Sequence, residues 1–296
     1  MRPELVRATD LLRINTPESV EEAIGLLQNT VYSFSMKVCG HPQDAEDNMQ
    51  EVLFRSLGHL AKIQGPHELA VWLYTVTRNR CWRTRRKSVY APASIRSLEE
   101  LLPDEEEIGR LLQDSGAGPE AGLLEAERHQ LLHKAILRIP AILRIVLVLH
   151  DMEELTTEQV ADILQLQPGT VRIRLHRARL SVSKEMNILL KGDSTAIVPR
   201  QTSAASSKSA KKRRKQPEDC GELLANLSDY IDGRVEARTC EQVRMHIEAC
   251  PSCVALVRHL RTAIDRCRSM EMPCESTVTY RLRVILTQEY LRMLVV

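Results

Sequence analysis

One histidine and two cysteines near the carboxyl end have the spacing of metal ligands. They are His246, Cys250 and Cys253, in an HxxxCxxC arrangement. On a helix, His246 and Cys250 share a face, and the CxxC bend brings Cys253 within reach of the same ion. Thiolates and imidazole favour tetrahedral zinc, for which Cys220 and Cys240 are candidate fourth ligands. The pattern predicts one zinc ion, structural or redox-sensing; the competing interpretation is a set of buried free thiols.

A second group of residues suits single-stranded nucleic acid. It lies on a helix that we expect after the breaker Gly65-Pro66. Five residues share one face of this helix: Trp72, Thr75, Asn79, Trp82 and Arg83. Aromatic rings stack on unpaired bases, while the arginines and lysines that crowd the carboxyl end of the helix neutralise phosphates. The alternative is a core tryptophan on a helix with a solvated basic end.

The preceding segment, 44 to 60, predicts an amphipathic helix with an acidic exposed side. Its apolar residues recur at helical spacing: Met49, Val52, Leu53, Leu57 and Leu60. The opposite face carries Asp44, Asp47 and Glu51, with Glu46 and Gln50 beside them. A row of carboxylates needs a basic partner surface, so this face indicates a docking site.

Residues 156 to 179 have the pattern of a helix-turn-helix. Thr156 and Gln159 form a capping box, and Pro168 suits the first position of the second helix. We expect Val160, Ile163, Leu164, Val171, Leu175 and Ala178 to face the core. The exposed face of the second helix presents Thr170, Arg172, Arg174 and Arg177. Arginines bind guanine and phosphates, as a recognition helix in a major groove requires. The alternative is an amphipathic helix pair that does not bind DNA.

Three of these segments resemble bacterial sigma factors of the extracytoplasmic-function (ECF) group. The stretches DAEDNMQEVLFR and WLYTVTRNRCWRTRRK are similar to the second conserved region, and ADILQLQPGTVRIRLHRARL is similar to the fourth. In that family the acidic helix binds the clamp of core RNA polymerase, the next helix engages the minus-ten element, and the helix-turn-helix reads the minus-thirty-five element. The resemblance assigns polymerase docking to Asp47, Gln50 and Glu51. It assigns the promoter strand to Trp72, Thr75, Arg78, Asn79 and Arg83.

One residue departs from the family pattern. Gln165 stands where the family commonly has a glycine in the turn of the helix-turn-helix. A left-handed conformation there costs a non-glycine residue about 1 kcal/mol.

The carboxyl third resembles a zinc-binding anti-sigma domain, a small helical bundle that lies between two sigma domains. The resemblance rests on Cys220, the stretch LSDYIDGRV and the HxxxCxxC arrangement. The spacing in that family favours Cys220 over Cys240 as the fourth ligand beside His246, Cys250 and Cys253. It also implies that this domain contacts its own sigma domains and regulates them in cis.

Length and composition predict an all-α protein with several units. The chain has 296 residues, more than one typical domain, and its aromatic content of 3% is low, which favours helical bundles. We expect a region-2-like domain (1–87), an acidic linker (88–122), a region-4-like domain (123–190), a flexible basic tether (191–217) and a zinc-binding helical domain (218–296). The basic run in the tether favours phosphate attraction over a nuclear import signal.

The distribution of charge and of cysteines indicates the partners of the protein, its location and the role of its thiols. The net charge is only +2, yet acidic and basic blocks are segregated, so local fields guide the partners. We see no apolar run long enough for a membrane helix and no signal peptide, and we expect a cytoplasmic protein. Eight cysteines in such a chain favour metal binding over disulfides.

The sequence therefore predicts a sigma factor that binds core RNA polymerase and directs promoter-specific transcription initiation, with regulation in cis by its zinc-binding domain. We find no catalytic motif and expect a non-enzyme. The main alternative is a helix-turn-helix regulator that senses zinc or redox state without docking on polymerase. A third interpretation is a sigma-shaped scaffold that binds other sigma or anti-sigma factors.

Overall fold

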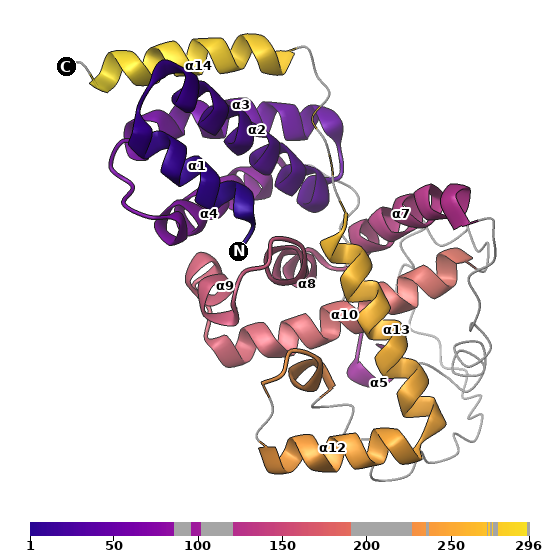
Figure 1. Cartoon of the computed structure of the whole chain (residues 1–296). Coiled ribbons are helices and arrows are strands. Elements are labelled where there is room, and N and C mark those ends of the chain that lie inside the picture. Colours follow the sequence, from indigo (N-terminus) through magenta and orange to yellow (C-terminus); the bar gives the residue numbers. More distant parts are fainter. Residues whose placement is uncertain are drawn as a thin grey trace. The chain divides into compact units, whose positions relative to one another are not determined.

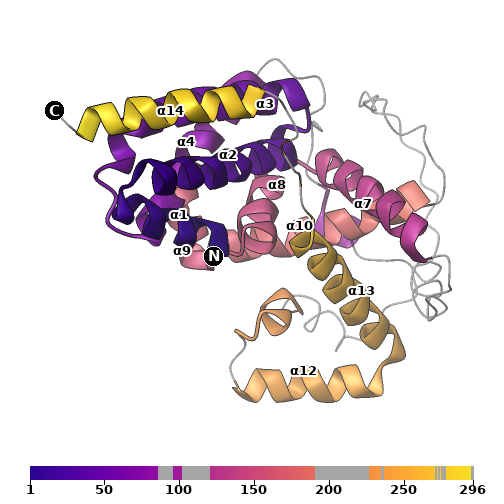
Figure 2. The ribbon, with the colours of Figure 1, turned by 45° about the horizontal axis from the view of Figure 1, so that its top comes forward.

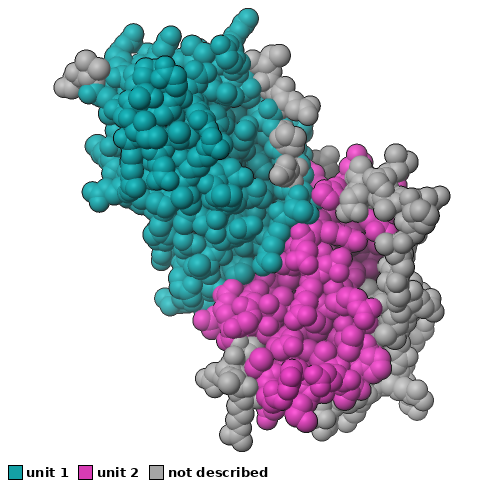
Figure 3. All heavy atoms as spheres, viewed as in Figure 1, with its two compact units in different colours: residues 1–91, 141–171, 267–296 teal, residues 92–140, 172–266 magenta. Residues whose placement is uncertain are grey.

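The computed structural model describes residues 1–85, 96–101, 121–190, 227–234, 237–270, 272, 274 and 278–294. Within these residues every regular element is a helix, which confirms the predicted all-α class (Figure 1). Two compact units group the chain without following its order (Figure 3). Unit 1 contains residues 1–91, 141–171 and 267–296, and unit 2 contains residues 92–140 and 172–266. Of the described helices, none is long and apolar enough to cross a membrane.

Four helices form the amino-terminal bundle of unit 1: α1 (Pro3–Ile14), α2 (Pro17–Cys39), α3 (Pro42–Leu60) and α4 (Pro66–Arg85). Each begins with a proline, a residue suited to the first helical position because its missing N–H would have no partner there. Thr16 and Ser19 form a capping box on α2, which ends at Gly40 in a left-handed conformation (φ 79°).

The core of this bundle is apolar and lies around α2. The five α3 residues predicted to face inward are all buried: Met49, Val52, Leu53, Leu57 and Leu60. The rings of Phe34 on α2 and Tyr74 on α4 lie 5.0 Å apart between centroids, which joins the two helices. The helical periodicity of the sequence thus predicted the buried face of α3 correctly.

The carboxyl-terminal helix α14 (Val278–Leu294) belongs to the same unit and lies along the bundle (Figures 1 and 2). It buries Leu282, Leu286 and Tyr290. Gln28 of α2 accepts a hydrogen bond from Arg283 Nε (3.2 Å) and donates one to the Thr279 carbonyl (3.1 Å). A Cβ atom on Gly25 would lie 3.1 Å from the Arg283 Cζ, so a glycine in mid-helix leaves room for this guanidinium.

Three further elements lie entirely in unit 1: α8 (Ala141–Leu147), the π-helix η1 (Val148–Met152) and α9 (Thr157–Leu164). The buried Arg144 of α8 donates to the Val38 carbonyl at the end of α2 (2.8 Å). The capping box of Thr156 and Gln159 forms as predicted. Gln165 has φ 53° and ψ 51°, so the turn does require the left-handed conformation expected from its position.

Unit 2 assembles its core from segments that are distant in the chain. Its elements are α5 (Leu98–Leu101), α7 (Ala121–Arg138), most of α10 (Pro168–Leu190), a helical turn at 227–231, α12 (Ala237–Ala249) and most of α13 (Pro251–Arg268). One apolar cluster joins α5, α10, the turn at 227–231 and α13: Leu101, Leu180, Leu227, Leu256, Val257 and Leu260. The carboxyl-terminal region and α10 therefore share a core.

Candidate functional site

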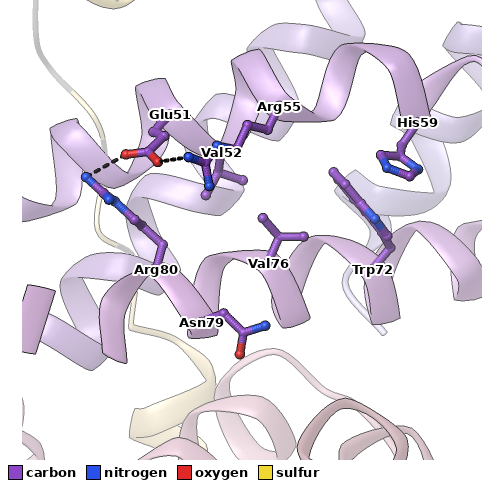
Figure 4. A pocket seen from close by; sticks show the side chains of 8 residues that line it. All are labelled: Glu51, Val52, Arg55, His59, Trp72, Val76, Asn79 and Arg80. Atoms are coloured by element: carbon purple, nitrogen blue, oxygen red, sulfur yellow. Dashed lines mark ion pairs between the residues drawn. The ribbon is translucent and has the colours of Figure 1, made fainter. Parts of the chain in front are cut away.

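A cleft between α3 and α4 contains part of the predicted nucleic-acid surface (Figure 4). Its lining residues are Glu51, Val52, Arg55, His59, Trp72, Val76, Asn79 and Arg80. The rings of His59 and Trp72 face each other with 4.8 Å between centroids. The cleft combines aromatic faces, an amide and two guanidinium groups, which is chemistry suited to an unpaired base and its phosphate.

Glu51 lies in this cleft and is already paired. Its carboxylate contacts Arg55 (2.7 Å) and Arg80 (2.5 Å), as the dashed lines in Figure 4 show. Asp47 on the same helix is exposed, and Gln50 is half-buried. The three residues predicted to dock on polymerase thus differ: Asp47 offers an exposed carboxylate, whereas Glu51 positions Arg80 at the cleft. Sequence reasoning missed His59, Arg55 and Arg80 here.

The promoter-strand residues predicted on α4 do not all point the same way. Arg83 lies in α4, but its side chain is outside the described residues. Of the other four, Trp72 and Asn79 line the cleft, while Thr75 is half-buried and is not a lining residue. Arg78 turns instead toward α9, where its Nη1 donates to the Ile163 carbonyl (2.7 Å), and its Nη2 donates to Asn79 Oδ1 (2.7 Å). Burial lowers the pKa of Arg78.

The predicted recognition helix is α10. The residues expected to hold its inner face, Val171, Leu175 and Ala178, are buried. Arg172 is exposed, whereas three residues are half-buried: Thr170, Arg174 and Arg177. These four polar residues therefore lie on α10 away from its buried face, which is compatible with the predicted DNA contact and does not test it.

Two further residues of α10 bind the segment 227–232, and sequence reasoning missed both. Arg179 pairs with both carboxylate oxygens of Asp232, at 2.8 and 3.1 Å, and both side chains are almost fully buried. His176 Nδ1 lies 3.0 Å from Ser228 Oγ. Burial, with the charge of Arg179 added, lowers the pKa of His176 to about 4. Their spacing of three residues predicts that they share one face of α10, but no local sequence pattern indicates that this face binds the segment 227–232.

The three predicted metal ligands in the described part of the chain come together. His246 lies in α12, Cys253 lies in α13, and Cys250 lies between these helices. Their ligand atoms all lie within 4.8 Å of one another, and the Cys253 Sγ lies 3.4 Å from His246 Nε2. Tetrahedral zinc with bonds of about 2.0 to 2.3 Å needs such separations, so the donor set fits zinc. Among the described residues Cys240 is not part of this group, and Cys220 lies outside the described residues.

Three family models match the sequence, in an order that follows the chain. "Sigma-70 region 2" matches residues 24–89, "Sigma-70, region 4" matches residues 129–182, and "Putative zinc-finger" matches residues 220–253. The last match begins at Cys220 and ends at Cys253. The first match covers α3 and α4 with the cleft, and the second covers α9 and the first part of α10.

Related proteins are sigma factors by name. The ECF RNA polymerase sigma factor SigW of Bacillus subtilis is 24% identical over 175 residues, 58% of this chain and 91% of the relative. The RNA polymerase sigma-H factor of Pseudomonas aeruginosa is 27% identical over 188 residues, 62% and 89% of the two chains. The ECF RNA polymerase sigma-E factor of Escherichia coli K12 is 26% identical over 148 residues, 50% and 76%. These relatives do not favour a regulator unrelated to polymerase. The chain is a sigma factor of the sigma-70 family, related to the ECF group, with a putative zinc finger after its two sigma regions.

Proposed function

We propose that the protein binds core RNA polymerase and directs transcription initiation at specific promoters, as a cytoplasmic, non-enzymatic subunit. The observation that carries this proposal is the α3–α4 surface, on which an exposed carboxylate, Asp47, lies on the helix that also lines an aromatic and basic cleft. A basic surface of polymerase would meet Asp47 and Gln50. The cleft with Trp72 and Asn79 would receive the opened promoter strand.

The recognition helix α10 would read the upstream promoter element. Arg172 is exposed, and Arg174, Arg177 and Thr170 are half-buried. A guanidinium that binds a guanine in the major groove discriminates against other bases by about 1 to 3 kcal/mol. We assign the base contact to one of these arginines and phosphate contacts to the others.

The zinc finger would hold one zinc ion through Cys220, His246, Cys250 and Cys253. The geometry of the last three residues and the family match that starts at Cys220 support this ligand set. Zinc would cross-link α12 to the start of α13, where the apolar cluster beside the ligands has two buried residues among those described. Thiolate ligands also make the site sensitive to oxidation.

The carboxyl-terminal segments would restrain the sigma regions in cis. Two contacts support this: α14 buries Leu286 at the bundle of α1–α4, and Asp232 binds Arg179 on the helix that carries the recognition arginines. A helix packed on α2 and α3 would hinder the approach of polymerase to α3, and a partner on α10 would limit how α10 enters a groove. Loss of zinc or oxidation of its thiolates would weaken the restraint.

Polymerase docking is tested by charge reversal at Asp47. We expect Asp47→Lys to abolish co-elution of the full chain with core polymerase and run-off transcription, because the basic surface would then meet a cation. Asp162→Lys, an exposed reversal on α9, serves as the control and should change neither result. Co-elution of Asp47→Lys at the wild-type level would refute the docking assignment.

Restraint in cis is tested on α14 with two neighbouring residues. Leu286→Glu places a charge on the buried face, and Ile285→Glu places one on a side chain that is 48% exposed. We expect Leu286→Glu to raise run-off transcription severalfold and Ile285→Glu to leave it unchanged. Equal or lower transcription with Leu286→Glu, at equal polymerase occupancy, would mean that α14 assists initiation instead.

A further inference from the structure

A buried carboxylate joins the region-4 segment of unit 1 to the amino-terminal bundle. Glu153 follows the π-helix η1, and its side chain is 2% exposed. An ionised carboxylate in such a place costs several kcal/mol unless it is paired and hydrogen-bonded. The partners of Glu153 therefore decide whether this contact forms.

All of these partners come from the bundle. Lys37 of α2, itself fully buried, places its Nζ 2.8 Å from Glu153 Oε1. The Tyr74 hydroxyl of α4 donates to Oε2 (2.7 Å), and Arg2, which precedes α1, places its Nε 3.2 Å from the same oxygen. Arg2 also donates twice to the Met152 carbonyl, at 2.9 and 2.8 Å. Four segments thus meet at one carboxylate.

The ion pair between Lys37 and Glu153 is a contact that can open at a small net cost in free energy. Lys37 and Glu153 lose hydration when they pair, so the net contribution of the pair to stability is small. Removing one partner while the other stays buried is costly, because it leaves a buried charge without a counter-charge. When the two sides separate, water solvates both charges again. An apolar interface of the same size would gain no favourable hydration when its two sides separate.

The same face holds a predicted promoter contact away from DNA. Arg78 donates to the Ile163 carbonyl at the end of α9, and Gln159 of α9 contacts His67 of α4 (2.9 Å). In this closed arrangement the Arg78 guanidinium is occupied within the chain. A nucleic acid strand on α4 has to displace α9 from Arg78.

We propose that Glu153, with Lys37, Tyr74 and Arg2, forms a latch that holds η1 and α9 against α1–α4 and so withholds Arg78 from promoter DNA until the latch opens. All four latch residues lie outside the putative zinc finger at residues 220–253. Its consequence for DNA rests on the proposed promoter role of Arg78, whereas its existence does not.

The first test is hydrogen–deuterium exchange on the full chain, comparing Glu153→Gln with Glu154→Gln. The first variant leaves Lys37 buried without a counter-charge, while the second changes an exposed neighbour in the same way. Because an eight-residue helix is marginal alone, α9 should fray once it is released. We expect its amides to exchange about tenfold faster in Glu153→Gln, with α2 unchanged, and no effect in Glu154→Gln. Unchanged exchange in α9 would overturn the latch.

Two further variants cover the case in which Glu153→Gln unfolds the bundle. Tyr74→Phe removes one hydrogen bond and no charge, and should accelerate exchange in α9 by a smaller factor. Lys37→Met combined with Glu153→Gln removes both charges, and should exchange more slowly than Glu153→Gln alone. If neither change is seen, the network has no role in closure.

The second readout is binding of a fluorescein-labelled 20-nucleotide single-stranded DNA to the full chain, followed by anisotropy. A latch predicts at least threefold tighter binding by Glu153→Gln, whereas a purely structural role predicts equal or weaker binding. Weaker binding with fast exchange in α9 would refute the withholding of Arg78. Failure of run-off transcription by the wild type would instead refute the proposed function and leave the exchange result standing.

Discussion

The bundle of α1–α4 buries long apolar side chains from every helix, whereas the cluster beside the zinc ligands has two buried residues among those described, Val243 and Cys253. Partly buried neighbours, Tyr230, Ile247 and Cys250, complete this cluster. So small an apolar core does not offset the chain entropy lost on folding. From this comparison we infer that the bundle folds mainly on apolar burial, while the carboxyl-terminal region needs its contact with α10 and the zinc ion proposed above.

Removal of the metal should break the carboxyl-terminal region and leave the bundle intact. We expect Cys250→Ser with Cys253→Ser to lose zinc and to expose the amides of α12 to fast exchange, since zinc contributes about 10 kcal/mol or more to folding of small zinc domains. Metal analysis and hydrogen exchange measure both effects. Cys240→Ser is the control and should retain one zinc per chain. Zinc retained by the double variant would exclude these ligands.

The second dependence of this region is the ion pair between Arg179 and Asp232. Arg179→Ala removes the buried, bidentate partner of the Asp232 carboxylate, so we expect a loss of about 3 kcal/mol in the stability of unit 2. Arg234→Ala removes a more exposed arginine from the same carboxylate (3.3 Å) and should cost less than about 1 kcal/mol. Exchange rates of the α13 amides measure the difference, and equal effects of the two variants would contradict it.

The stability of the bundle should fall when a cavity is made in its core and should not change when the metal is removed. Leu53 is almost fully buried on α3, so Leu53→Ala should lower the free energy of unfolding of the bundle by about 2 to 5 kcal/mol. The neighbouring Phe54 is 48% exposed, and Phe54→Ala should change it by about 0.5 kcal/mol or less. Tryptophan fluorescence reports on unfolding because both tryptophans lie in α4. A chelator that shifts this transition would break the comparison.

The smallest expected effect is a pH dependence confined to the contact of α10 with 227–232. His176 has a pKa of about 4 in the folded chain against 6.5 ordinarily, and it faces Arg179, Asp229, Arg177 and Ser228. The unfolded chain therefore binds a proton first as pH falls, so the stability contributed by neutral His176 is complete above pH 6.5 and is lost toward pH 4. Exchange of α13 amides should rise from pH 7 to pH 5 relative to intrinsic rates. His176→Gln should flatten this rise, and an unchanged slope would show that another group causes it.

The sequence alone predicted the local features of this protein, because each of them depends on residues a few positions apart. Pro66 and Pro168 begin helices, Thr156 and Gln159 cap one, and the apolar residues of α3 face inward as their spacing predicted. His246 and Cys250 are four residues apart, so helix geometry alone predicted that two of the three grouped candidate ligands lie close together.

Only the tertiary structure decided which distant side chains meet. Nothing in the sequence indicates that Glu153 contacts Lys37 and Tyr74. Nor does a local pattern predict the pairing of Arg179 with Asp232, because the two residues lie far apart in the chain. The resemblance assigned Arg78 to the promoter strand together with Asn79 and Trp72, and the structure shows that its guanidinium binds the end of α9. Periodicity shows which face of a helix is covered. It does not show what covers it, because that depends on packing between elements far apart in the chain.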